Sequence, residues 1–471
     1  MRGGLFTAPC PRRTIQSVYG APHSPSTGYD DHGGDLVAHP GARLDFSVNV
    51  NPLGTPAPVR QAIVDGLTTM GQYPDPWCRG LRQALADHHG IDPAMIVCGN
   101  GASDVIHRVV AVRRPRRVLT PAPTFTEYAR SALATGAEVV HHRLMPPLFD
   151  LDDTFLDRLT SDIDMVFLCQ PNNPTGRLIG SDLLAAVIDR AAQIGATVVI
   201  DECFLPFTDA DSVITTKSPA DSRHRPGSGS DAPPTDRPGP MMGRQTPPLS
   251  DQTSSGDTSA SRADLPPHVI VIRAFTKTHG MAGLRLGYAV STDRHLIAAM
   301  AAQPPHWNVS SLAQVAGRAA VGLSEWDERT RALVRAERAY LTEELTRLGL
   351  GVVGSDANFL LFRCDRLALR PDTARRGNEE ATSHQHDLHS ALLDQGILIR
   401  ACASFIGLDE TYFRVGLHSR ADNVTLVEAL WHALDHPEPG PVALIPEPQQ
   451  PHPHPPQRPA TPDQHPDGGT P

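Results

Sequence analysis

The stretch AFTKTHGMAGLRLGYAV, residues 274–290, combines a lysine, a glycine-rich turn and an arginine. Lys277 comes two residues after the β-branched run HVIVIRAF, residues 268–275, and Arg285 stands eight residues after the lysine. A lysine amine forms a Schiff base with an aldehyde cofactor, and the planar fork of an arginine binds a phosphate group. Because a lysine at a strand end is more often only a solvated residue, this interpretation depends on the motifs around it.

A buried carboxylate is expected in VVIDECFLPF, residues 198–207. Asp201 comes at the carboxyl end of an apolar strand, where an acidic side chain costs desolvation unless a cation meets it. The protonated nitrogen of a pyridine ring would be such a cation, and Asp201 would then keep the ring an electron sink. A helix N-cap, or a metal ligand together with Glu202, is the structural alternative.

A side-chain donor is expected in CQPNNPTGRL, residues 169–178. Asn173 can donate a hydrogen bond to a phenolic ring oxygen, and Pro174 and Gly176 fix the turn that presents it. The alternative is an ordinary NPTG turn without a ligand.

A phosphate site is expected in VCGNGASDVIHRVV, residues 97–110, where a glycine turn leads from a strand into a helix. The backbone N–H groups of Ala102 and Ser103, with the Ser103 hydroxyl, lie where a helix N-terminus binds anions. Ser103 would otherwise serve only as a cap. Phe125, in PTFTEY at residues 123–128, is placed to stack on a cofactor ring, although an aromatic residue after a strand often belongs to the core.

The remaining pattern alternates β-branched runs with amphipathic stretches and predicts an α/β fold. Expected strands are VVAVRRPRRVLTPAP, AEVVHHRL, DMVFLCQP, ATVVIDE, HVIVIRAF and GYAVS, and expected helices include SDLLAAVIDRAAQIG and TRALVRAERAYLTEELTRLG. Several strands are apolar on both faces, as buried parallel strands are. We expect a large domain over residues 60–310 with a mostly parallel central sheet flanked by helices, and a smaller α+β domain over residues 311–435.

Four polar segments without a hydrophobic period are expected to be disordered. They are an arm at residues 1–28, an insertion at 216–266, a flexible insertion at 366–386 and a Pro- and His-rich tail at 436–471.

Composition narrows the class of partner. The formal net charge of −10 argues against nucleic acid and against an anionic membrane surface. The seven cysteines are scattered without CxxC spacing, and the chain has no apolar run of membrane-spanning length. We therefore expect a cytoplasmic protein with reduced cysteines, no Cys-based metal site and a small-molecule substrate.

Taken in order, GNGASD, PTFTEY, PNNPTG, IDECF, TKTHGMAGLRLG and FRVGL resemble the motifs of fold-type I, class I/II aminotransferases. The resemblance implies pyridoxal 5'-phosphate as cofactor, Lys277 as the catalytic residue, and a homodimer with its active sites near the subunit interface. It also implies that Thr276 binds the cofactor. Phe204 stands where that family has a tyrosine that contacts the ring oxygen, so one donor to this oxygen is missing.

Three other stretches resemble the threonine-phosphate decarboxylases of cobalamin synthesis, a subfamily whose near relatives are the histidinol-phosphate aminotransferases. They are DHGGD at residues 31–35, LDFSVNVNPLG at 44–54 and GILIRACASFIGLDETYFRVGL at 396–417. The resemblance implies that His32, Gly33 and Asn49 touch a small phosphorylated amino acid, and that residues 29–59 pack with the small domain. Arg400 and Arg414 would bind its anionic groups, as forked cations do. Asp35 departs from the usual asparagine of this subfamily.

Two reactions are compatible with these residues. If the arginines and His32 hold the substrate carboxylate out of the ring plane, CO₂ leaves and threonine phosphate yields (R)-1-aminopropan-2-yl phosphate. If the Cα–H bond lies perpendicular to the ring, Lys277 takes that proton and transamination follows. A silent cofactor-binding protein is a third reading, against which the intact Lys277, Asp201 and Arg285 argue.

Overall fold

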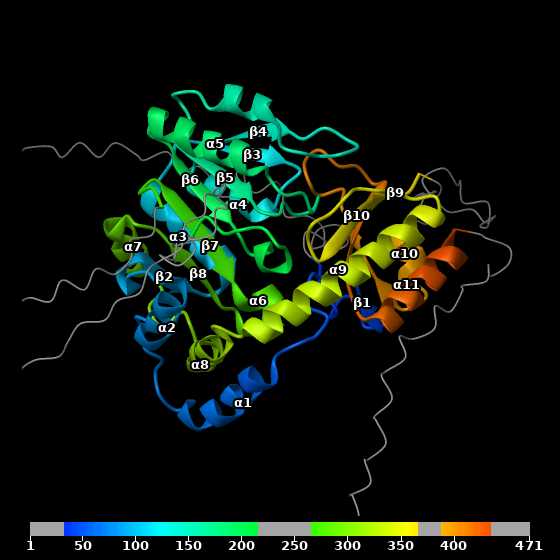
Figure 1. The fold of residues 1–471 in the computed structure, drawn as a ribbon, viewed down its shortest axis with the longest axis horizontal. Helices are drawn as coiled ribbons and strands as arrows, with labels where there is room; N and C mark the ends of the chain where they lie inside the picture. Colours follow the sequence, from blue (N-terminus) through cyan, green and yellow to red (C-terminus); the bar gives the residue numbers. More distant parts are fainter. Residues whose placement is uncertain (1–32, 215–264, 366–387, 435–471) are drawn as a thin grey trace, which may run out of the picture.

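A computed structural model describes residues 33–214, 265–365 and 388–434 (Figure 1). Its centre is a seven-stranded sheet in the order β2-β8-β7-β6-β5-β3-β4. These strands are β2 (Ile96–Gly99), β3 (Arg117–Ala122), β4 (Glu138–Arg143), β5 (Met165–Cys169), β6 (Thr197–Asp201), β7 (Val269–Ala274) and β8 (Gly287–Val290). Only β8 is antiparallel to its neighbours, so the six other strands of this sheet all run in one direction.

Except for the edge strand β4, the strands of this sheet are buried on both faces, because successive side chains enter different clusters. Ile270 and Ile272 of β7 join one cluster, with residues of α3 (Gly101–Arg113), α4 (Thr126–Ala134) and α7 (Arg294–Ala301). Val269 and Val271 join the other, with residues of α2 (Arg79–His89), α5 (Ser181–Ile194) and α8 (Ser311–Ala320). The α/β architecture with a mostly parallel, helix-flanked sheet is thus confirmed.

A second, smaller body is formed by the C-terminal part of the chain (Figure 1). Its antiparallel sheet has the order β12-β13-β10-β9, and its strands are β9 (Gly351–Val352), β10 (Phe359–Arg363), β12 (Arg400–Ala401) and β13 (Tyr412–Gly416). The helices α9 (Ser324–Arg347), α10 (Leu388–Leu393) and α11 (Arg420–Ala433) accompany it, and α9 extends from the large body into the small one. A short parallel pair, β1 (Leu44–Asp45) with β11 (Ile397–Leu398), ties the N-terminal segment to this body.

The remaining elements are short except for α1 (Ala57–Gly66), which packs on α8. They are α6 (Phe275–Thr278) and the 3-10 turns η2 (Leu67–Thr69), η3 (Pro93–Met95), η4 (Asp153–Arg158), η5 (Leu205–Phe207) and η7 (Ala282–Leu284). The helix α8 begins at residue 311 but packs in the apolar cluster of the large sheet. The expected boundary between the large and the small domain at residue 310 therefore stays a prediction.

The prediction of one strand was wrong for the first half of its sequence. The stretch VVAVRRPRRVLTPAP begins inside α3, which ends at Arg113, and only its second half forms β3. Val105, Val109 and Val110 lie on the buried side of this helix, so β-branched residues that suggested a strand serve helical packing instead. Pro115 helps to end the helix, and Arg114 before it adopts a left-handed conformation.

The segments expected to be disordered lie almost entirely outside the described residues, as does His32. In the described ranges, no helix is long and apolar enough to cross a membrane.

Candidate active site

The carboxyl ends of the co-directional strands meet a cavity of about 470 Å³ that also borders β12 and β13. In open α/β sheets, ligands bind outside the carboxyl ends of the strands. Within the described ranges, every residue predicted for the site lines this cavity. They are Gly33, Asn49, Ala102, Ser103, Phe125, Asn173, Asp201, Phe204, Thr276, Lys277, Arg285, Arg400 and Arg414.

Lys277 is presented to the cavity by α6, the single helical turn that directly follows β7. Burial lowers the pKa of its amine to about 8, and the nearby guanidinium groups of Arg414 and Arg285 act in the same direction. Its Nζ makes no hydrogen bond or ion pair with any described residue. Lys277 is therefore a buried amine that is partly neutral at physiological pH, as a nucleophile toward an aldehyde must be.

This pKa predicts how the cofactor-free protein takes up pyridoxal phosphate. Because only the neutral amine attacks an aldehyde, the rate of attachment should rise about ten-fold from pH 6 to pH 7 and level off above about pH 8. Stopped-flow absorbance after mixing with pyridoxal phosphate measures this rate. The same experiment with a free alkylamine is the reference, since its rate keeps rising to about pH 10. If the attachment rate of the protein depended on pH in the same way as that of the free amine, this would contradict a lowered pKa for Lys277.

Asp201, the last residue of β6, is held by two donors. The Tyr128 hydroxyl donates to Oδ2 over 2.7 Å, and the Cys203 backbone N–H donates to Oδ1 over 3.0 Å. Burial raises the pKa of this carboxyl group, although both hydrogen bonds oppose the rise. A buried carboxylate at the cavity wall, with no cationic side chain paired to it among residues 33–214, 265–365 and 388–434, is suited to a cationic ring nitrogen.

The alternatives for Asp201 find no support. Glu202 turns to Arg273, whose Nη2 lies 2.8 Å from Oε2, and to the Ser212 hydroxyl. No group of three or more potential metal ligands occurs in the described part of the chain. Phe204, not Asp201, is the N-cap of the following turn η5.

The start of α3 forms an anion cradle. Its N-cap, Asn100, makes no side-chain capping hydrogen bond, so the first N–H groups of the helix remain available. Gly101 has a φ of +82°, and a Cβ there would lie 2.7 Å from Nη2 of Arg285. A Cβ on Gly287 would lie 2.8 Å from the Ala102 nitrogen. Gly101 thus lets the guanidinium come close enough to the helix start for both to bind one phosphate. Gly287 lets the helix start pack closely against β8.

Arg414 links the cofactor side of the cavity to the substrate side. It donates to Asn173 Oδ1 and, over 2.9 Å, to the Ser47 carbonyl oxygen. Since Asn173 Oδ1 is occupied, its Nδ2 group is left to donate into the cavity. Burial lowers the pKa of Arg414 to about 10, and its Nε has no partner in the described structure. A buried guanidinium with an unused donor is a binding group for an anion.

The substrate side holds a second guanidinium and an unused acceptor. Arg400 lies opposite Arg414 in the pairing of β12 with β13, and it donates to the Ser404 hydroxyl over 2.8 Å. The Oδ1 atom of Asn49 is buried without a hydrogen-bond partner in the described ranges. A Cβ on Gly33 would lie 2.2 Å from the Ser47 carbonyl oxygen, so only glycine fits there.

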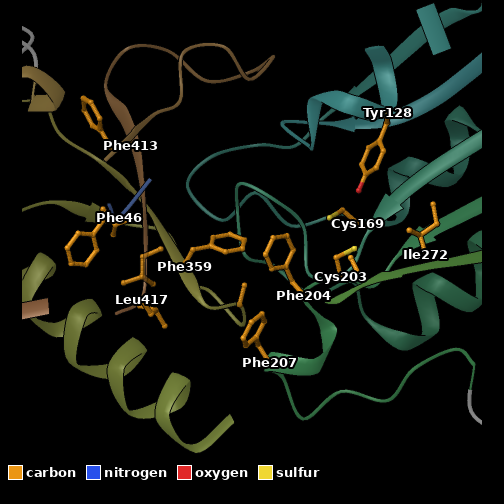
Figure 2. Close-up of a cluster of buried hydrophobic side chains, with 14 of the residues drawn as sticks. Phe46, Tyr128, Cys169, Cys203, Phe204, Phe207, Ile272, Phe359, Phe413 and Leu417 are labelled. Carbon is orange, nitrogen blue, oxygen red and sulfur yellow. The ribbon is translucent and has the colours of Figure 1, made fainter. Parts of the chain in front are cut away.

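The two aromatic residues predicted for the ring pocket pack edge to face with other rings. Phe125 contacts Tyr128 at a centroid distance of 5.5 Å, and Phe204 contacts Phe359 at 5.1 Å. Figure 2 shows the Phe204 and Phe359 rings next to each other between the two bodies.

Several residues that line the cavity, or that hold a residue of its wall, were not predicted from the sequence. Tyr128, which lies inside the motif PTFTEY, holds Asp201, while Ser47 holds Arg414. Arg130 and Phe405 also line the cavity. No signal in the sequence alone marked Tyr128 as the partner of Asp201, because PTFTEY fits a core tyrosine equally well.

The residues fit a cofactor that carries an aldehyde, a phosphate and a basic ring nitrogen. The buried amine, the helix start with its guanidinium and the buried carboxylate line one cavity and match these three groups. Fold and site together define a pyridoxal-phosphate enzyme of fold type I. The chain belongs to the aminotransferase class I and II family, whose model matches residues 43–430.

Two relatives agree with this family, and one solved structure has the same fold. It is 34% identical over 412 residues to a threonine-phosphate decarboxylase from Salmonella typhimurium, covering 86% of this chain and 96% of that protein. It is 32% identical over 418 residues to a histidinol-phosphate aminotransferase from Symbiobacterium thermophilum, covering 88% of this chain and 96% of that protein. A histidinol-phosphate aminotransferase from Sinorhizobium meliloti in complex with pyridoxal-5'-phosphate has the same fold, with a TM-score of 0.64, 20% identity and coverage of 85% and 93%.

Proposed function

We propose that this enzyme decarboxylates L-threonine O-3-phosphate to (R)-1-aminopropan-2-yl phosphate in cobalamin synthesis. The observation that carries the proposal is the pair of buried guanidinium groups of Arg400 and Arg414 in the cofactor cavity. A substrate with both a carboxylate and a phosphate supplies anions for two such groups. The similarity to the Salmonella threonine-phosphate decarboxylase supports the same substrate. His32, which lies outside the described residues, is proposed to contact the substrate as well.

When bound, pyridoxal phosphate supplies an electron sink for negative charge on the substrate α-carbon. Asp201 keeps the ring nitrogen protonated, and Tyr128 and Cys203 hold Asp201 in place. Asn173 donates to the ring oxygen, and Phe125 and Phe204 enclose the ring. Ala102, Ser103, Thr276 and Arg285 hold the cofactor phosphate.

Arg414 and Arg400 bind the substrate anions and thereby orient the carboxylate, while Gly33 and Asn49 form the wall beside it. Lys277, with an amine whose pKa is near 8, returns a proton to the α-carbon after CO₂ has left.

Product analysis tests this proposal. The holoenzyme is incubated with O-phospho-L-threonine, with and without a 2-oxoacid, and the CO₂ and amine products are measured. We expect CO₂ release that does not depend on the 2-oxoacid. Consumption of the 2-oxoacid without CO₂ would instead establish the alternative, a histidinol-phosphate-type aminotransferase, and histidinol phosphate is the substrate to compare.

Arg414→Lys is expected to lower kcat/KM for the phosphorylated amino acid by about 10²-fold or more. Lysine cannot reproduce a planar fork that also reaches Asn173 and the Ser47 carbonyl. Steady-state kinetics measure the loss. The control is Arg363→Lys on the neighbouring strand β10, because Arg363 is half-exposed and pairs with Asp365. Equal losses in both variants would contradict a substrate-binding role for Arg414.

We further propose that the enzyme forms a homodimer through an apolar surface made by Val64 of α1, by Met70 and Tyr73 after η2, and by Trp307 before α8. Val64, Met70, Tyr73 and Trp307 are 58%, 65%, 84% and 49% exposed, and the Tyr73 and Trp307 rings lie 5.2 Å apart. Exposed apolar patches of this kind mark protein interfaces. Enzymes of this family usually form dimers, which agrees with this proposal.

Met70→Asp is expected to shift the enzyme from dimer toward monomer, because a charge would then be buried in the interface. Analytical ultracentrifugation measures the shift. Met145→Asp is the matched control, since Met145 is 68% exposed outside this surface. A wild-type protein that sediments as a monomer would rule the dimer out.

A further inference from the structure

A second cavity, of about 270 Å³, lies beside the cofactor cavity. Phe125, Thr126 and Arg130 line both cavities and so form one part of the wall between them. The loop at residues 404–406 forms the other part. Phe405 lines the cofactor cavity, while Ser404 and Ile406, on either side of it in sequence, line the second cavity.

Phe405 is held firmly in this wall. Its side chain is buried in a small apolar cluster with Leu144, Phe149 and Cys402. Its N–H donates to the Cys402 carbonyl over 3.0 Å, and its own carbonyl accepts from Leu408 N–H over 3.0 Å. Gly407, two residues after Phe405, has a φ of +99°, and a Cβ there would be 3.4 Å from the Ala122 carbonyl oxygen at the end of β3. The loop is therefore a tight turn seated on the large sheet.

The two cavities differ in chemistry. Arg285, Arg400 and Arg414 line only the first, and Arg130 lines both. Leu133, Ala134 and Ile406 line only the second. Its imidazole, His141, has a pKa lowered by burial, so the ring is neutral at physiological pH. The second cavity thus suits the ring of a bulky amino-acid side chain, if the wall between it and the cofactor cavity were open.

We propose that Phe405 is a specificity-determining residue that limits the substrate to a small amino-acid side chain. Its ring closes the cofactor cavity on the side where the second cavity would otherwise extend it. The identity of the substrate rests on the function proposed above. The size limit does not, because it follows from Phe405 lining the cofactor cavity while its two neighbours in sequence line the second cavity.

Phe405 also lies against the substrate-binding arginine, with its ring centroid 5.5 Å from the Arg400 guanidinium carbon. Truncating Phe405 can therefore weaken the binding of every anionic substrate. The proposal predicts a change in the ratio between large and small substrates, which such a uniform loss would leave unaltered.

The test uses the holoenzyme and the variants Phe405→Ala, Phe405→Val and Ile406→Ala. Dissociation constants are taken from the change in the visible spectrum of the bound cofactor on addition of O-phospho-L-tyrosine or O-phospho-L-threonine. Opening the wall should lower the ratio of the tyrosine to the threonine constant by about ten-fold or more in Phe405→Ala, and by less in Phe405→Val. Ile406→Ala, which enlarges only the second cavity, should keep the wild-type ratio.

An unchanged ratio in the Phe405 variants overturns the proposal, and so does an equal change in Ile406→Ala. If Phe405→Ala does not fold, Phe405→Val alone decides. The same ratio is measured with unphosphorylated L-tyrosine and L-threonine. A wild-type enzyme without preference for phosphorylated over plain threonine would refute the proposed substrate, while the ratio for the plain pair would still decide the role of Phe405.

Discussion

Replacing Lys277 by alanine is expected to abolish the visible absorption band of the bound cofactor and to lower turnover by at least about 10³-fold. The loss is large because this amine both attaches the cofactor and moves a proton at the substrate carbon. The α3 start and Arg285 remain, so the variant should still bind pyridoxal phosphate, without the covalent bond. Absorption spectroscopy and steady-state kinetics measure the two effects.

The sequence offers a matched control for this prediction. The chain contains only two lysines, Lys217 and Lys277. Lys217→Arg should keep the wild-type spectrum and turnover. Loss of the absorption band in Lys217→Arg, or its survival in Lys277→Ala, would show that Lys277 is not the amine that binds the cofactor.

Asp201→Asn is expected to lower kcat by about 10³-fold, because a neutral amide cannot keep the ring nitrogen protonated. The fold should tolerate the change. Burial raises the pKa of this carboxyl group, which means that its charged form is disfavoured in the folded protein, and an amide removes that charge. Thermal unfolding of Asp201→Asn should therefore occur close to the wild-type temperature, while kinetics show the loss of turnover.

Tyr128→Phe provides a graded comparison. It removes the 2.7 Å hydrogen bond to Asp201 Oδ2 and leaves the Cys203 N–H donor and the carboxylate itself in place. Its kcat should fall between those of the wild type and Asp201→Asn. A variant Asp201→Asn with nearly full turnover would show that this carboxylate does not support the ring.

Most of the site could be predicted because its residues follow strands. Ala102, Asn173, Asp201 and Lys277 each come at or just after the end of β2, β5, β6 or β7, and strands that run in one direction bring these ends to one edge. Short sequence motifs at the strand ends therefore predicted residues that lie together in one cavity.

The contacts that sequence reasoning missed join segments far apart in the chain. Tyr128 reaches Asp201 across 73 positions, and Arg414 reaches Ser47 across 367. Nothing in PTFTEY alone distinguishes a tyrosine that holds a carboxylate from one that fills the core. The wall role of Phe405 likewise depends on where the turn at Gly407 meets β3, which only the tertiary structure contains.

The β-branched face of α3 misled the strand prediction for a related reason. Valines at positions 105, 109 and 110 match a buried helix face as well as a strand, and the sheet on which they pack decides between the two.

Reduction of the holoenzyme with borohydride, followed by peptide mass spectrometry, tests the central claim most directly. Because the chain has two lysines, the result is a choice between two peptides. We expect a reduced pyridoxal-phosphate adduct on Lys277 and none on Lys217. An adduct confined to Lys217, or none on either lysine after saturation with the cofactor, would contradict the account.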